Sequence, residues 1–201
     1  MAAPIRDLVQ RFDGLLRRCL GVYEFTTDPA CILRISLQPA RTCHVLADGT
    51  HIEPGDALVT IHLWNERLPR MPSSGADLRW AVQIYRSFVA SLRILARHVA
   101  LDPKLTAAVA IFGETGFLTT AQLDSGVGAL TRLGFEIHRL PPPANVRERF
   151  IRFWPNLYSH ALLWTFNPAT LPDKPFWRLE RCQVWMSRAA LEQRYGQSPP
   201  K

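Results

Sequence analysis

The sequence contains few cysteines and no long apolar run. Its four cysteines lie far apart without a CxxC pair, so neither a disulfide framework nor a usual zinc motif is expected. Cysteines of this kind are typical of a reducing compartment. The amino-terminal stretch carries Arg6, Asp7, Arg11 and Asp13, which interrupt the apolar core that a signal peptide needs. No apolar run reaches the ~20 residues that span a bilayer. We therefore expect a cytoplasmic protein that is soluble or peripheral on the inner membrane face.

Several motifs of catalysis and nucleotide binding are also absent. The chain has no GxSxG sequence, which excludes the nucleophile elbow of an α/β-hydrolase. It has neither a Walker motif nor a GxGxxG fingerprint, so a usual nucleotide-phosphate loop is excluded as well. No motif of a DNA- or RNA-binding domain is present, and we expect no nucleic-acid partner.

Lysine is scarce: of the 24 lysines and arginines, only Lys104, Lys174 and Lys201 are lysines. The formal net charge is +7. A basic chain favours an anionic partner such as nucleic acid, phospholipid or a phosphate-bearing cofactor. GC-rich coding would enrich arginine over lysine without any partner, so both explanations stay open.

The length of 201 residues is enough for one domain with a substantial core. We predict a single α+β domain over residues 1–196 and a disordered tail over 197–201. Residues 144–179 are rich in aromatics and prolines and are expected to form a helical insertion, which Pro155 divides into two helical pieces.

Local patterns predict the order of the elements. A helix over 5–20 is followed by strands over 32–37, 43–46, 50–52 and 57–63, a helix over 78–99, a strand over 107–112, a helix over 119–133, strands over 135–140 and 182–186, and a last short helix. Asp48-Gly49 marks a hairpin turn, and Asp77 or Ser74 caps the long helix. The order predicts a central, mostly antiparallel sheet with helices on both faces.

The best candidate site lies at the end of the strand predicted over 57–63 and consists of His62, Asn65 and Glu66. A histidine beside a carboxylate can act as a general base, with Glu66 as its orienter, and Asn65 can orient a substrate or polarise a carbonyl. The alternative is a satisfied histidine and a solvated acid. His44 and His51 flank the hairpin turn, but their spacing with His62 matches no usual ligand motif, and no metal is expected.

Two further groups of residues suit binding. Glu114 is expected in a loop at the carboxyl end of the strand over 107–112, where α/β sheets place ligands, although it also suits an ordinary polar loop. The segment with Arg149, Arg152, Phe153 and Trp154 suits an anionic membrane interface. The alternative is a pair of core helices with a basic outer face.

Three segments, LRISLQPARTCHVLADGTHIEPGDALVTIHLWNERL, RLGFEIHRLPP and VWMSRAALEQRY, resemble the YkoP-like domain family, which occurs alone or fused to polysaccharide-deacetylase-like proteins. The shared features are the strand with Arg34, the DGT and GD turns, the HLxNE end, and the LGF and WMSR elements. The resemblance implies a setting near cell-envelope or glycan metabolism. It marks Arg34 as a candidate substrate contact, in addition to Glu114.

The order of elements also resembles GNAT-type acyltransferases. In that layout a splayed strand before the long helix binds the pantetheine arm, and the helix amino terminus binds the pyrophosphate. The resemblance implies acyl-CoA or acyl carrier protein as cofactor, held by the loop before the helix through Arg67, Arg70, Ser73, Ser74 and Gly75. This loop departs from the family's glycine-rich sequence, and Asp77 would repel a phosphate.

Two functions from different classes follow. One is an acyltransferase-like enzyme that acts on a small-molecule or lipid substrate of envelope lipid or glycan metabolism. The other is a non-catalytic binding or scaffold module of a lipid or polysaccharide pathway. The sequence gives neither the substrate nor the oligomeric state.

Overall fold

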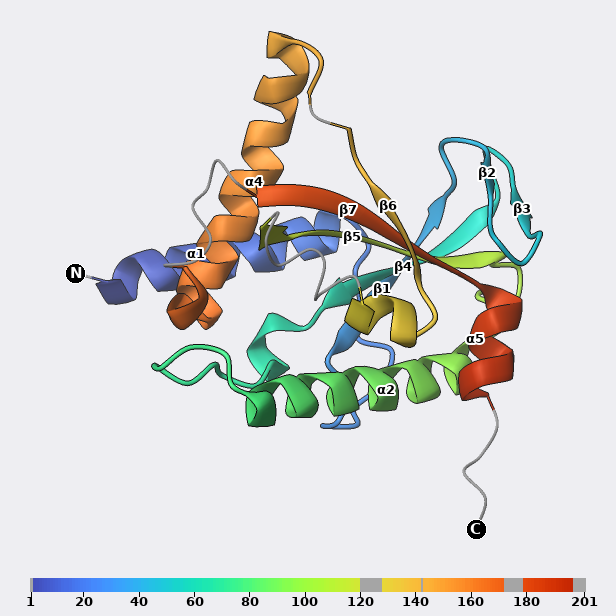
Figure 1. Ribbon diagram of the computed structural model, residues 1–201, viewed down its shortest axis with the longest axis horizontal. Helices are drawn as coiled ribbons and strands as arrows, with labels where there is room; N and C mark the ends of the chain where they lie inside the picture. Colours follow the sequence, from blue (N-terminus) through green and yellow to red (C-terminus); the bar gives the residue numbers. More distant parts are fainter. Residues whose placement is uncertain (1, 120–127, 142, 172–178, 197–201) are drawn as a thin grey trace.

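The computed structural model describes residues 2–119, 128–141, 143–171 and 179–196. A five-stranded sheet has the order β1-β4-β5-β7-β6, and β2 and β3 form a separate two-stranded sheet (Figure 1). The strands are β1 (Leu33–Pro39), β2 (His44–Val45), β3 (His51–Ile52), β4 (Ala57–Leu63), β5 (Ala110–Thr119), β6 (Glu136–Arg139) and β7 (Leu179–Ser187). The helices are α1 (Ala2–Cys19), α2 (Leu78–Leu101), α4 (Val146–Phe166) and α5 (Arg188–Tyr195), with the 3-10 turns η1 (Asn65–Arg67) and η2 (Pro168–Thr170).

The main sheet is mostly antiparallel, as the sequence predicts. β1 pairs antiparallel with β4, and β7 pairs antiparallel with both β5 and β6. The pair formed by β4 and β5 is parallel, and α2 makes the crossover between them. The predicted α+β class is therefore confirmed.

One face of the sheet carries the larger core. Alternate residues of β1, β4 and β5, such as Ile35, Val59 and Ile111, are fully buried against Leu92 and Leu95 of α2. Their period of two in the strands and the apolar stripe of α2 bring these side chains to one surface. Figure 1 shows α2 crossing one face of the sheet, with α5 at its carboxyl end.

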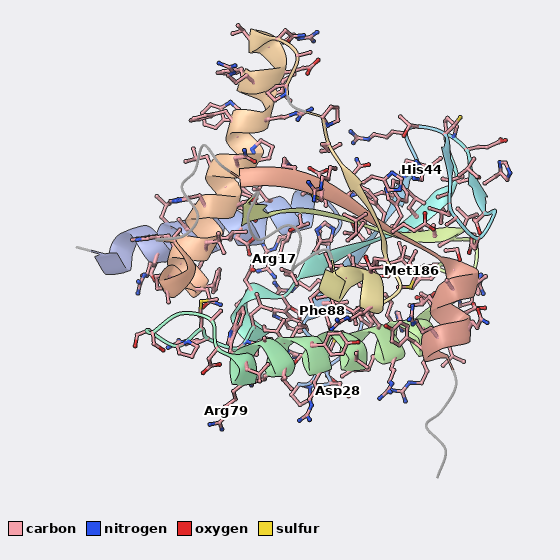
Figure 2. The ribbon with its side chains drawn as sticks, in the orientation of Figure 1. Arg17, Asp28, His44, Arg79, Phe88 and Met186 are labelled. Carbon is pink, nitrogen blue, oxygen red and sulfur yellow. The ribbon has the colours of Figure 1, made fainter. Side chains whose placement is uncertain are left out.

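The other face is covered in parts. The β2–β3 hairpin packs on it through Leu46 and Ile52, which contact Leu58 and Trp185 in a smaller core. Figure 2 shows His44 of this hairpin on the side of the sheet opposite Phe88 of α2. Helices α1 and α4 lie toward the other end of the same strands (Figure 1).

The helices begin and end at residues suited to those positions, and the predicted Asp77 cap is confirmed. Gly21 follows α1 with φ of 64°, the left-handed conformation that a glycine after a helix supplies. The Asp77 carboxylate accepts a 2.7 Å hydrogen bond from the Trp80 amide and caps α2. Ser187 caps α5 in the same way through the Ala190 amide at 2.9 Å.

The strands predicted over 43–46 and 50–52 do not join the main sheet. β1 pairs directly with β4, from Leu33 opposite Leu63 to Pro39 opposite Ala57, and the hairpin between them leaves the main sheet. Each hairpin strand pairs over two residues only, around the Asp48-Gly49 turn. Leu46 and Ile52 point from the hairpin into the smaller core, so it covers the sheet instead of extending it.

Two predicted breaks are absent. Glu114 lies inside β5 and not in a loop, because β5 continues beside β7 and pairs Glu114 with Gln183. Pro155 lies inside the single helix α4, so the prediction of two helical pieces is wrong. A proline removes one backbone hydrogen bond from a helix, and the remaining bonds of α4 keep the helix continuous.

Part of the predicted organisation lies outside the described residues. Of the helix predicted over 119–133, the structure describes a helical segment at 128–132. The predicted tail over 197–201 and residues 172–178 of the predicted insertion lie outside the described part of the chain.

Candidate functional site

A row of polar side chains crosses the face of the main sheet that points away from α2. Arg34 on β1 pairs with His62 on β4, and Ser36 pairs with Thr60, in the antiparallel register of the two strands. Because side chains alternate along a strand, these four share one face, while Ile35 points to the larger core. The structure therefore brings two predicted site residues, Arg34 and His62, next to each other.

His62 is half-buried and hydrogen-bonded to Ser36. Its Nε2 atom lies 3.0 Å from the Ser36 hydroxyl, which also accepts a 3.2 Å hydrogen bond from the Gln38 amide. Burial lowers the pKa of His62 to about 4, so the imidazole is neutral at physiological pH. Nε2 and the Ser36 hydroxyl share one hydrogen bond, whose donor depends on the imidazole tautomer. In either tautomer Ser36 is the side-chain partner of Nε2.

Glu66 contacts Arg34 and not His62. Its carboxylate lies 3.0 Å from Nη1 of Arg34 and 3.6 Å from Nη2 of Arg17. Within the described residues no hydrogen bond joins Glu66 to His62. The arrangement that Glu66 was predicted to make with the imidazole is therefore not formed. The buried guanidinium attracts the carboxylate more strongly than a neutral imidazole does.

Arg34 is the centre of an ion-pair network. It is 3 % exposed, and its guanidinium also contacts Glu24 at 2.9 Å and lies over the Trp64 ring at 4.5 Å. A buried guanidinium is stable only when its donors are satisfied, and two carboxylates meet that need here. Asn65 is half-buried in η1, next to this network along the chain.

Glu114 forms an ion pair with Arg181 of β7 at 2.6 Å, and Arg181 also donates to Asn156 of α4 at 3.2 Å. Glu114 thus links the sheet to α4. It lies on the same face as His62, since each stands two residues beyond the last paired positions of β5 and β4, Phe112 and Thr60.

The two parallel strands separate close to these residues. β4 and β5 pair over three positions, from Leu58 opposite Ala110 to Thr60 opposite Phe112. Both strands then continue, but no strand pairing joins them beyond these positions.

The predicted cofactor loop has mixed properties. Arg67 packs its guanidinium over the Trp64 ring at 3.4 Å and donates to the Asp28 carbonyl at 2.6 Å, so it serves a structural contact. Asp77 places a carboxylate on the amino terminus of α2, where a pyrophosphate would bind. The remaining predicted groups are accessible: Arg70, Ser73 and Ser74 are exposed, and Gly75 is partly exposed with φ of 98°.

The predicted membrane-contact segment is exposed. On α4, Phe153 is 41 % exposed and Trp154 is 56 % exposed, and Arg149 is exposed beside them. Arg152 is half-buried and donates to the Pro141 carbonyl. The amino-terminal half of α4 projects beyond the rest of the molecule in Figure 1. No helix in the described part of the chain is long and apolar enough to cross a membrane.

The sequence did not single out two residues that the structure adds to these sites: Ser36 and Arg181. Ser36 could have been found, because Arg34, Ser36 and Gln38 alternate along one strand and so share a face. The contacts of Arg181 depend on strands far apart in the sequence, and no local signal marks them.

Two cavities lie away from these residues. One of about 360 Å³ is lined by Gly134, Met186, Ala190, Gln193 and Arg194. The other, of about 390 Å³, lies between the carboxyl ends of α2 and α5. None of the predicted site residues lines either cavity.

Comparison with known proteins identifies relatives of the chain. A family model described as the YkoP domain matches residues 5–195. A Bacillus subtilis (strain 168) protein titled "Uncharacterized protein YkoP" is 34% identical over 112 residues, which cover 55% of this chain and 56% of the relative. The match thus spans about half the length of that relative. No solved structure matches with significance.

Proposed function

The chain belongs to the YkoP domain family, and we propose that it is a non-catalytic binding module that attaches to an anionic lipid surface. In this role it assists an envelope lipid or polysaccharide pathway. The observation that carries the proposal is the exposed apolar stripe on the projecting half of α4.

The stripe has the spacing of one helix face. Val146, Phe150, Trp154 and Leu157 recur at intervals of four, four and three residues, and they are 81, 63, 56 and 41 % exposed. Arginines at 147 and 149 are exposed beside them. Aromatic and aliphatic side chains enter the interfacial region of a bilayer, while arginines bind anionic headgroups.

A second exposed stripe adjoins the first. On α1, Leu8, Phe12 and Leu15 are 65, 51 and 57 % exposed at helical spacing. The Phe12 ring meets that of Tyr158 at a centroid distance of 6.3 Å, immediately after Leu157 in α4. Phe12 thus contacts α4 one residue after the end of the first stripe, and we include both stripes in the proposed lipid contact.

The polar row of the sheet favours binding over catalysis. Glu66, the predicted orienter of His62, is held by Arg34 and Arg17 instead. A general base must lie within hydrogen-bond reach of its substrate, and His62 lines neither of the two cavities described above. The groups of the polar row serve to fix β1, β4 and η1 together.

Vesicle flotation tests the lipid contact. The chain should float with vesicles that contain phosphatidylglycerol and much less with pure phosphatidylcholine, since each arginine near an anionic surface contributes about 1 kcal/mol. The double variant F150S/W154S should reduce binding tenfold or more, because both side chains leave the interface. Higher salt should also weaken the binding.

Leu101→Ser provides the matched control. This leucine is 82 % exposed at the end of α2, far along the chain from α1 and α4. The control should bind vesicles like the unmodified chain. Absence of flotation with both lipid mixtures, or equal loss in the control and the double variant, would refute the proposal.

A second candidate, an acyltransferase-like enzyme, is favoured by the separation of β4 and β5. Open strand amides can pair with the amides of a pantetheine arm carried by coenzyme A or acyl carrier protein. Here His62 would be the base, once Ser36 turned away, and Arg70, Ser73, Ser74 and Gly75 would hold the phosphates.

Calorimetry with acyl-CoA and with free CoA tests this second candidate. Binding that is lost in Arg70→Ala but kept in Arg79→Ala, an exposed arginine on the following helix, would support it. A folded His62→Ala variant should then bind the ligand but transfer no acyl group. No heat and no thermal shift with either ligand would remove this candidate and leave the lipid proposal in place.

A further inference from the structure

Two histidines from distant parts of the chain face each other across the covered face of the sheet. His44 on β2 and His138 on β6 are 94 residues apart, and their Nε2 atoms are 3.3 Å apart. The rings meet edge to face, with centroids 4.4 Å apart and an interplanar angle of 74°. Both side chains are half-buried, so solutes can reach them from solvent.

This separation has the dimension of a metal chelate. Two nitrogens bound to one zinc ion at about 2.0–2.1 Å in tetrahedral geometry lie roughly 3.3–3.4 Å apart. As a direct hydrogen bond, 3.3 Å exceeds the usual donor–acceptor range of about 2.7–3.2 Å. Each Nε2 has the other as its protein partner.

The surroundings hold this geometry. The His44 ring stacks on Trp185 with a centroid distance of 4.9 Å and an angle of 19°, which fixes its plane. Glu136 lies two residues before His138 on β6, and its Oε1 accepts a 2.9 Å hydrogen bond from the Ala47 amide. The carboxylate thus anchors the hairpin and supplies negative charge beside the two rings.

The surroundings of His44 favour its neutral imidazole. Burial, followed by the neighbouring His138, lowers the pKa of His44, against the opposite effect of Glu136. A neutral imidazole has a free lone pair on one ring nitrogen, which can bind a metal ion.

We propose that His44 and His138 together bind a divalent transition-metal ion of the zinc class, which clips the β2–β3 hairpin to the edge strand β6. Within the described residues no group of three or more His, Cys, Asp and Glu side chains is arranged to hold a metal. Two histidines therefore provide the protein ligands, and water completes the coordination. The ion takes the place between the two rings and stabilises the hairpin on the sheet.

Titration of the tag-free, chelator-treated chain with zinc and with cobalt(II) chloride tests the site. We expect one ion per chain, a visible cobalt absorption and a higher unfolding temperature. His138→Gln and His44→Gln should each weaken binding at least tenfold and abolish the thermal shift. Binding should also weaken near pH 5.5, where protons compete for the rings.

His51→Gln is the matched control. His51 lies on the same hairpin and is exposed. It pairs with Val45, the residue after His44 on β2. It should keep the full affinity. Equal binding by His138→Gln and the unmodified chain, or no saturable binding at all, would overturn the proposal. Either glutamine variant that keeps the circular-dichroism spectrum of the unmodified chain suffices for the comparison.

Discussion

At the scale of single residues, Arg34 shows how a buried charge organises its neighbours. Its guanidinium takes Glu24 on one side and Glu66 on the other, and it rests on the Trp64 ring. Both carboxylates are partly exposed, Glu24 by 49 % and Glu66 by 39 %, and either one still compensates the guanidinium when the other is removed. Loss of one therefore costs less than the about 3–5 kcal/mol of a fully buried pair. The carboxylate of Glu66 therefore has a structural role that its position after His62 does not reveal.

His62 should make the stability of the chain dependent on pH. Unfolded, its imidazole titrates near 6.5, and in the folded chain its pKa is lowered to about 4. As the pH falls from 6.5 to 4, the unfolded chain takes up a proton that the folded chain does not, so unfolding becomes more favourable. The full effect is about 3 kcal/mol and is absent above pH 7.

Urea unfolding of the unmodified chain and of His62→Gln at several pH values between 7.5 and 5 measures this effect. The variant should be less stable at pH 7.5, since the bond to Ser36 changes, but it should lose less stability toward pH 5. His51→Gln should keep the original pH dependence. Parallel curves for the unmodified chain and His62→Gln would contradict the prediction.

At the scale of elements, β5 depends on the absence of a side chain at Gly113. A Cβ atom there would lie 2.9 Å from Cγ2 of Val184 and 3.0 Å from Cγ1 of Ile61, side chains of β7 and β4. Gly113 thus lets both neighbouring strands pack closely at the point where β4 and β5 separate.

Gly113→Ala should therefore destabilise the chain by about 1–3 kcal/mol, as overpacking of a core usually does. Gly128→Ala is the control, because a Cβ there meets nothing within 4 Å and its residue is helical. It should leave stability unchanged or raise it by about 0.5–1 kcal/mol. Chemical denaturation gives both values, and equal stability of the two variants would refute this account of Gly113.

Elements with a complete local signal were predictable. The apolar stripe of α2 and its Asp77 cap, the Asp48-Gly49 turn and the Ser187 cap of α5 are each specified by residues within a few positions. Pro155 misled, because a proline weakens a helix without always ending it. The prediction of a loop at Glu114 was also wrong, because pairing with β7 keeps the strand extended.

At the scale of the whole molecule, a chain of contacts joins α4 and the amino-terminal helix α1 to the sheet. The Tyr158 hydroxyl of α4 donates a hydrogen bond to the carboxylate of Asp13 in α1. Oδ2 of Asp13 lies 3.0 Å from Nε of Arg17. Arg17 in turn approaches Glu66, which is bound to Arg34. Burial, followed by the bond to Asp13, raises the pKa of Tyr158, so the hydroxyl keeps its proton and the contact persists at alkaline pH.

Contacts of this long range were the part of the candidate sites that the sequence did not contain. His62 and Arg34 were both identified, but their actual partners, Ser36 and Glu66, follow from the β1–β4 register. The facing pair of His44 and His138 requires the hairpin to fold over the sheet. Periodicity specifies which face a side chain occupies, and only the tertiary arrangement specifies what it meets there.

The place of β7 between β5 and β6 has a consequence for synthesis of the protein. This strand, residues 179–187, is translated after both of its neighbours. Until it emerges from the ribosome, β5 and β6 each have an unpaired side that can associate with other nascent chains. The sheet is therefore completed late, and premature termination before residue 179 should leave a product that aggregates or is degraded.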